Sequence, residues 1–184
     1  MQLPAICNHH RVKIALLTLS LLIAGCNNGK SAATYDNFTS GLNNYFLDHT
    51  ECLLPNTRFP LEVTDKDQIK QMDTLVKATL LDKTIDAGVK TARYTPTTVG
   101  ARYAPHFCYG HREIVSIDSS SPLQVSNGFK VTSVTYHYKM QDVPVWAKTP
   151  DVQAAFPAMA LSTSGQATGK ATLAQSPVGW QVPD

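Results

Sequence analysis

One stretch of the chain combines basic and aromatic side chains and carries no acidic residue. It runs from residue 90 to residue 112 of the 184-residue sequence. Cations interleaved with aromatic rings suit a pocket for an anionic sugar, a lipid headgroup or an acidic loop of a partner protein. The candidate binding residues are Arg93, Arg102, Tyr103, Tyr109 and Arg112. The alternative is a solvated face that balances the acids of the preceding segment, which are Asp65, Asp67, Asp73, Asp82 and Asp86.

Motifs that would identify an enzyme are absent from the sequence. We find no nucleophile elbow, no His-Glu-x-x-His, no phosphate loop, no EF-hand loop and no paired Cys-x-x-Cys. His49 follows Asp48 at the end of a predicted helix, where an imidazole suits the negative end of the helix dipole. We therefore expect His49 to cap that helix, and we expect a non-catalytic protein that needs no cofactor or metal.

The N-terminus has the pattern of an export signal. Arg11 and Lys13 lie in a basic head, and the uncharged run IALLTLSLLIA occupies residues 14–24. A signal-peptide core needs about 7 to 15 apolar residues, whereas a membrane span needs about 20. We expect residues 1–25 to be a signal peptide that is not part of the fold.

The run ends in a more specific motif. Ile23-Ala24-Gly25-Cys26 resembles the lipobox of bacterial lipoprotein precursors, and the chain in general type resembles small uncharacterised lipoproteins of proteobacterial envelopes. The resemblance implies that the peptide is cut before Cys26 and that this thiol is acylated, which anchors the protein to a lipid bilayer. Because Asn27 rather than Asp follows the cysteine, the resemblance also implies the outer membrane, on the side that faces the periplasm.

Composition indicates one folded domain and no polyanion partner. Hydrophobic residues make up 43% of the chain and charged residues 16%. The formal net charge of +2 belongs to Arg11 and Lys13, so the mature chain is neutral, and we expect no nucleic-acid binding. We expect residues 26–33 to be the lipidated cysteine with a flexible tether, and residues 34–184 to form a single periplasmic domain.

The cysteines indicate one disulfide bond. Cys7 is removed with the predicted signal peptide, and Cys26 is the predicted site of acylation. Cys52 and Cys108 therefore remain as free thiols that can pair. Two thiols in an oxidising compartment predict a Cys52–Cys108 disulfide. The alternatives are a catalytic cysteine with a histidine, or a metal site that uses Cys108 and His111.

Periodicity predicts helices first and strands later. Apolar spacing predicts a helix over 34–49 with an aromatic stripe and a second over 65–81, and one or two short helices within 144–157. Strands are expected over 111–118 and 129–140, with Asn127-Gly128 as a hairpin turn, and a last hairpin over 168–182. Residues 75–103 resemble the helix-to-wing passage of winged-helix domains. The expected fold class is α+β, with N-terminal helices packed on an antiparallel sheet.

These observations predict a lipid-anchored envelope lipoprotein that works by binding an envelope partner, with a protein as the expected kind. The alternative is a periplasmic hydrolase or a small-ligand carrier with an unrecognised site. An enzyme needs an enclosed pocket with converging titratable groups, whereas a binding protein needs an exposed surface.

Overall fold

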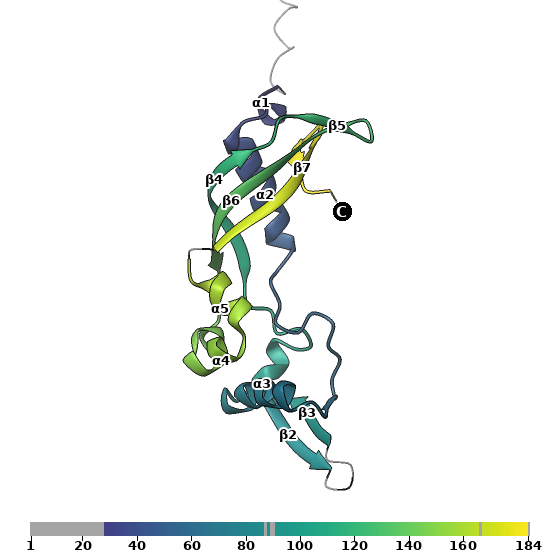
Figure 1. Ribbon diagram of the computed structural model, residues 1–184, viewed down its shortest axis with the longest axis vertical. Coiled ribbons are helices and arrows are strands. Elements are labelled where there is room, and N and C mark those ends of the chain that lie inside the picture. Colours follow the sequence, from purple (N-terminus) through teal and green to yellow (C-terminus); the bar gives the residue numbers. More distant parts are fainter. Residues whose placement is uncertain (1–27, 87, 89–90, 166, 184) are drawn as a thin grey trace, which may run out of the picture.

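The computed structural model describes residues 28–86, 88, 91–165 and 167–183, which form an elongated body of two lobes (Figure 1). The large-sheet lobe holds the described residues of 28–49, 111–141 and 167–183. The small-sheet lobe holds those of 52–109 and 143–163. The predicted signal peptide and Cys26 lie outside the described residues. Helices and two antiparallel sheets confirm the α+β class, although the helices divide between two sheets rather than covering one.

The large sheet is antiparallel. Its strands are β4 (His111–Ser120), β5 (Gln124–Ser126), β6 (Phe129–Gln141), β7 (Ala167–Ser176) and β8 (Gly179–Gln181), in the order β4-β6-β7-β8 with β5 paired to β6. The predicted alternation of β6 is confirmed, since Val134 and Tyr136 are buried while His137 is exposed. The predicted hairpin turn is also confirmed: Asn127 and Gly128 both have positive φ and join β5 to β6.

Helix α2 (Tyr35–Asp48) covers one face of the large sheet and contacts β4 and β8. Thr34 caps its first turn by accepting a hydrogen bond from the Asn37 amide at 3.3 Å. The predicted stripe is buried in the lobe core through Phe38, Leu42 and Phe46. At the other end, His49 donates from Nδ1 to the Tyr45 carbonyl at 2.7 Å, which confirms the predicted cap.

The segment expected to be a flexible tether is instead attached to the large-sheet lobe over its described residues. It contains a single helical turn, α1 (Asn28–Ser31). The Gln175 side-chain amide donates to the Ser31 carbonyl at 2.5 Å, and the Trp180 indole donates to the Ala32 carbonyl at 3.0 Å. These donors from β7 and β8 attach Ser31 and Ala32 to the sheet.

The small sheet consists of β1 (Leu61–Val63), β2 (Leu81–Asp86) and β3 (Thr91–Pro96), in the antiparallel order β1-β3-β2. Helix α3 (Lys66–Lys77) lies against it, so the passage that resembles winged-helix domains folds as a helix followed by a hairpin. The Asp65 carboxylate caps α3 by accepting hydrogen bonds from two backbone amides, at 3.1 Å and 2.9 Å.

The prediction that this helix extends to residue 81 is wrong. The helix ends at Lys77 because Thr79 takes a positive φ of 60°, and the buried Leu80 and Leu81 lead into β2. Thr97 holds this turn, since its hydroxyl donates to the Thr79 carbonyl at 2.7 Å and its amide donates to the Leu80 carbonyl at 3.0 Å.

Short helices complete the small-sheet lobe. They are η1 (Gly100–Arg102), η2 (Val145–Lys148), α4 (Pro150–Ala155) and α5 (Pro157–Thr163). The short helices predicted within 144–157 are present, with Trp146 buried in the core. Helix α5 lies beyond the predicted segment, which ends at Pro157. Pro157 occupies the first turn of α5, where a helix makes no hydrogen bond from the backbone N–H that proline lacks.

The two lobes have separate hydrophobic cores, and Met140 packs against both. Between them, the chain segments around Glu51 and Tyr109 run side by side. The Glu51 amide donates to the Gly110 carbonyl at 2.8 Å, and the Tyr109 amide donates to the Glu51 carbonyl at 2.7 Å. Residues far apart in the sequence therefore meet at this lobe junction.

Candidate functional site

The lobe junction is closed by a covalent bond. Cys52 and Cys108 form the predicted disulfide, with their Cα atoms 3.7 Å apart and an isolated β-bridge between the two residues. This bond excludes the alternatives of a Cys108–His111 metal site and a free catalytic thiol at either position. Within the described part of the chain, no group of three or more His, Cys, Asp or Glu residues is placed to hold a metal ion.

Arg112, one of the predicted binding residues, is the centre of the junction. Its Nη2 lies 2.6 Å from Glu51 Oε1, and its guanidinium carbon lies 4.6 Å and 5.1 Å from the ring centres of Tyr138 and Phe46. Nη1 donates to the Tyr136 hydroxyl at 3.3 Å. Burial acts to lower the pKa of Arg112, but Glu51 and the tyrosine hydroxyls outweigh it, so the pKa is raised. Arg112 therefore stays a cation and ties α2 to the sheet and to the junction.

The other predicted binding residues lie elsewhere. Tyr109 is buried at the junction with 5% of its surface exposed, and burial raises its pKa. Tyr103 packs edge-on against Trp146 in the small-sheet core, with ring centres 5.6 Å apart. Arg102 is exposed in η1, and Arg93 is exposed on β3.

The structure therefore does not bring these candidates together on one exposed basic and aromatic face, which a single binding surface formed by them would require. Strand alternation and core packing send these side chains in different directions, and Arg112 is only 25% exposed. The alternative, in which the arginines pair with acids of the preceding segment, is not what the structure has either. Arg93 lies 3.8 Å from Glu62 on β1, and Arg112 pairs with Glu51.

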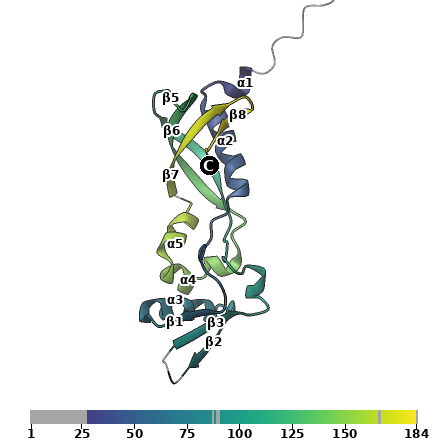
Figure 2. The same cartoon turned by 90° about the vertical axis from the view of Figure 1, so that its right-hand side faces the viewer.

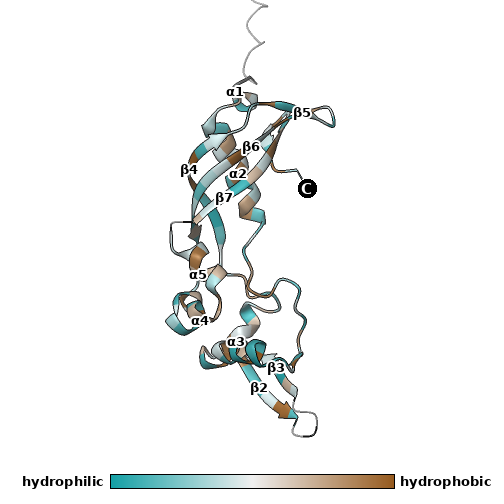
Figure 3. Ribbon diagram, in the orientation of Figure 1, coloured by the Kyte–Doolittle hydropathy of each residue, from teal (hydrophilic) through white to brown (hydrophobic). Residues whose placement is uncertain are grey.

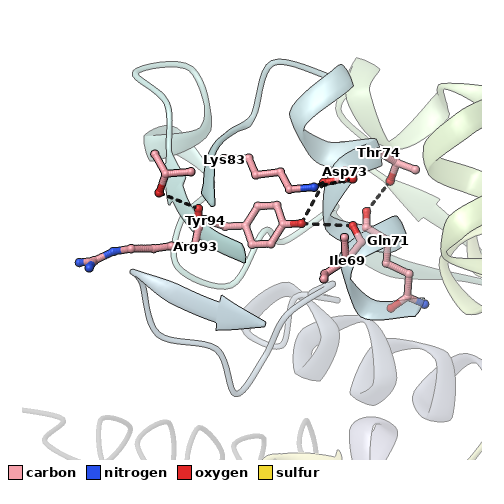
Figure 4. A network of polar contacts seen from close by, with 8 residues as sticks. Ile69, Gln71, Asp73, Thr74, Lys83, Arg93 and Tyr94 are labelled. Carbon is pink, nitrogen blue, oxygen red and sulfur yellow. Dashed lines mark hydrogen bonds and ion pairs between the residues drawn. The ribbon is translucent and has the colours of Figure 1, made fainter. Parts of the chain in front are cut away.

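A second polar cluster lies between α3 and the small sheet (Figure 4). The Tyr94 hydroxyl donates to Asp73 at 2.9 Å, and the Lys83 ammonium contacts the same carboxylate at 2.8 Å. Burial, reinforced by the Asp73 carboxylate, raises the pKa of Tyr94. Figure 4 shows Arg93 directed away from this cluster. Since each of these three polar groups is satisfied by another, we assign the cluster a structural role, joining α3 to β2 and β3.

A groove runs along α2 on the side that faces β7 and β8. One hollow of about 460 Å³ includes in its lining Tyr45, Phe46, Glu51, Arg112, Lys170 and Thr172. A second hollow of about 440 Å³ shares Tyr45, His49 and Val182 with the first and continues along α2 toward Trp180. We call this pair of hollows the edge groove, because its sheet side is the edge of β7.

That edge carries no strand over residues 167–173 among the described residues, because β8 pairs only with residues 174–176. Ser176 and Gly179 close a two-residue hairpin, so Ser176 and Ala174 direct their backbone groups toward β8. By alternation, Thr172 and Lys170 direct their backbone groups to the same side. We call residues 167–173 on this side the open edge of β7.

The C-terminal tail does not close this edge. If β8 continued in its register, Val182 would face Leu173 and Pro183 would face Thr172. Pro183 has no backbone N–H to donate, and the strand ends at Gln181. The tail instead contributes Val182 and Pro183 to the wall of the edge groove.

The opposite edge of the large sheet, on β4, is protected. Two register irregularities interrupt its pairing with β6, between Ile114 and Ser116 and between Ile117 and Ser119. The Asn43 side chain of α2 also accepts a hydrogen bond from the Ile114 amide at 2.8 Å. Natural sheets protect their edges in these ways against unwanted pairing. The open edge of β7 lacks such a cover among the described residues.

The chemistry of the edge groove suits main-chain binding. Glu51 and Arg112 neutralise each other, and the His49 ring stacks on Tyr45 with ring centres 3.7 Å apart. Aromatic walls beside a row of backbone donors and acceptors are what an extended peptide needs. Sequence reasoning found Arg112 but missed Glu51, Lys170 and Thr172, because strand order is not visible in a single sequence.

No helix among the described residues has the length and apolar character needed to cross a membrane. No protein-family model, no curated protein and no solved structure matches the chain.

Proposed function

We propose that this protein is a lipid-anchored cell-envelope lipoprotein that binds an extended segment of a partner protein along the open edge of β7. The lipobox-like run that ends at Cys26 supports the anchor, and Asn27 supports the periplasmic face of the outer membrane. The observation that carries the binding function is that no strand among the described residues pairs with Lys170 and Thr172 on the side of the edge groove.

An added strand gains affinity from main-chain hydrogen bonds and specificity from the pockets that flank it. The seven residues of the open edge accommodate a strand of about five residues, a common length. Side chains on one face of that strand would enter the edge groove, between Tyr45 and the Glu51–Arg112 pair. A partner segment with an apolar or aromatic side chain at that position fits the walls.

The test uses a photoreactive amino acid at Lys170 in cells that express the full chain. We expect a discrete crosslinked protein that is absent when the same group replaces Thr98, which is exposed on the small-sheet lobe. Thr172→Pro removes an outward N–H and should abolish the crosslink, whereas the matched control Thr172→Val keeps the N–H and should preserve it. Equal crosslinking by both variants, with both folded by circular dichroism, would refute binding at this edge.

A further inference from the structure

The distance between the proposed lipid anchor and the body is limited by the short chain between Cys26 and α1. Asn28 lies only two residues after Cys26, so the acylated residue lies within about 7 Å of chain from the described body. The Asn37 side chain donates to the Gly29 carbonyl at 2.6 Å, in addition to the bonds from Gln175 and Trp180. An anchor at Cys26 therefore holds this end of the body against the bilayer.

The hairpin of β5 and β6 lies at the same end of the long axis as α1, and both views agree on this (Figures 1 and 2). The apolar side chains of this hairpin, and of Leu123 directly before β5, are exposed: Leu123 by 49%, Val125 by 75% and Phe129 by 54%. The register pairs Val125 with Lys130 and Ser126 with Phe129, so Val125 and Phe129 emerge on opposite faces of the hairpin. A hairpin with apolar side chains on both faces suits insertion into a lipid bilayer, where acyl chains contact both faces.

The charges at this end suit a lipid surface. The sequence has no acidic residue from 27 to 35, from 119 to 141 or from 175 to 183. The basic side chains of Lys30 and Lys130 lie within the first two of these segments and are exposed. Lysine beside apolar side chains is favoured at membrane interfaces, where the ammonium meets phosphate groups and the apolar groups meet acyl chains.

The opposite end of the body differs. The end of β2 is coloured hydrophobic in Figure 3, and Ile85 there is 67% exposed, but Asp86 follows it directly. This end is remote from α1, the described element next to the proposed anchor, because α1 and β2 occupy opposite ends of the long axis (Figure 1). Ile85 is therefore a matched control for Phe129, since it is an exposed apolar residue at the tip of a hairpin.

We propose that the β5–β6 hairpin, through Leu123, Val125 and Phe129, dips into the bilayer to which Cys26 is attached. This inference rests on the proposed lipid anchor. It gives the lipoprotein two membrane contacts, the acyl chains and the hairpin, and these fix its orientation. The small-sheet lobe then points away from the membrane, and the edge groove is held at a set height beside it.

The experiment uses the lipidated protein in vesicles of phosphatidylethanolamine and phosphatidylglycerol. Phe129→Trp and Ile85→Trp each add one reporter to the two buried tryptophans, and the parent emission is subtracted. We expect the reporter at position 129 to shift to the blue and to be quenched by brominated acyl chains. We expect the reporter at position 85 to show neither effect.

The outcomes separate the two proposals. Co-flotation of the protein with vesicles, together with palmitate label at Cys26, tests the anchor alone. If the protein floats but the reporter at position 129 is not quenched, the hairpin inference is wrong and the anchor stands. If the protein is neither labelled nor floated, the proposed anchor is wrong, and the hairpin inference falls with it.

Discussion

Arg112 and Glu51 are joined by an ion pair of 2.6 Å at the junction where the two lobes meet. Arg112 is the second residue of β4 in the large sheet, and Glu51 lies in the segment that leads from α2 to the small-sheet lobe. The pair is next to the Cys52–Cys108 disulfide, so one covalent and one ionic contact join the same two segments. We expect this junction to set both the stability of the body and the shape of the edge groove.

Replacement of Arg112 by alanine should destabilise the protein by about 2 kcal/mol, because Glu51 would keep a partly buried charge without its partner. Arg93→Ala is the matched control. Arg93 forms a long, exposed pair with Glu62, and its loss should change stability by less than about 0.5 kcal/mol. Chemical denaturation measures both values. Equal losses of stability in the two variants would show that the junction pair stabilises the protein no more than an exposed pair does.

Removal of the disulfide should also lower stability. The cysteines are 56 residues apart in the sequence, and a bond that closes a long loop restricts the unfolded chain. The double variant Cys52→Ser, Cys108→Ser should lose about 2 to 4 kcal/mol in denaturant unfolding. Thiol titration of the denatured, unreduced mature protein should find neither cysteine free. Two reactive thiols at these positions would contradict the bond.

Alkaline pH should unfold the protein through its buried tyrosines. Burial raises the pKa of Tyr94 and Tyr136, so the folded state holds their protons more tightly than the unfolded chain, where tyrosine titrates near about 10. Their contribution to stability is complete below about pH 10 and is lost as the pH rises toward their folded values. Absorbance at 295 nm follows this titration. Full tyrosine ionisation near pH 10 without unfolding would disprove it.

The hydrogen bond of Tyr94 can be tested separately by Tyr94→Phe. The variant keeps the ring but removes the donor to Asp73, which retains Lys83 as a partner. We expect a loss of about 1 kcal/mol in urea unfolding. Tyr35→Phe, at an exposed position, should change stability by less than about 0.5 kcal/mol. If the two substitutions cost the same, the cluster at α3 does not stabilise the small-sheet lobe.

Apart from the disulfide, the features predictable from sequence were local ones, and the strand order and long-range contacts were not. Alternation along β6 and the Asn127-Gly128 turn are local, and both are confirmed. The end of α3 was not predicted, because Leu80 keeps the helical spacing and only its contact with Thr97 shows that the chain has turned. The contact between Leu80 and Thr97 cannot be inferred from a single sequence.

The same limit applies to the site. Cys52 and Cys108 could be paired by elimination, since Cys7 belongs to the predicted leader and Cys26 is the predicted site of acylation. Arg112 could be selected as a candidate by its residue type. Its role could not be predicted, because its partner Glu51 lies in a distant segment of the sequence. The open edge of β7 depends on where β8 stops pairing, and that follows from strand order and from Pro183.

Cys26→Ala should block both acylation and cleavage of the leader at this position. We expect the variant to lose palmitate label and to leave the detergent phase on phase separation, while Cys7→Ala keeps both properties. Fractionation of the labelled wild-type protein should place it with the outer membrane. Label retained by the Cys26→Ala variant would show that the lipobox interpretation is wrong.

The most direct measurement of the proposed function is amide hydrogen exchange at Lys170 and Thr172, with and without the crosslinked partner segment as a synthetic peptide. Both amides point away from β6 and should exchange rapidly in the free protein. Strand addition predicts strong protection of these two amides in the complex, with Ala171, which points to β6, already protected before binding. A bound peptide that leaves Lys170 and Thr172 in rapid exchange would contradict binding along the open edge of β7.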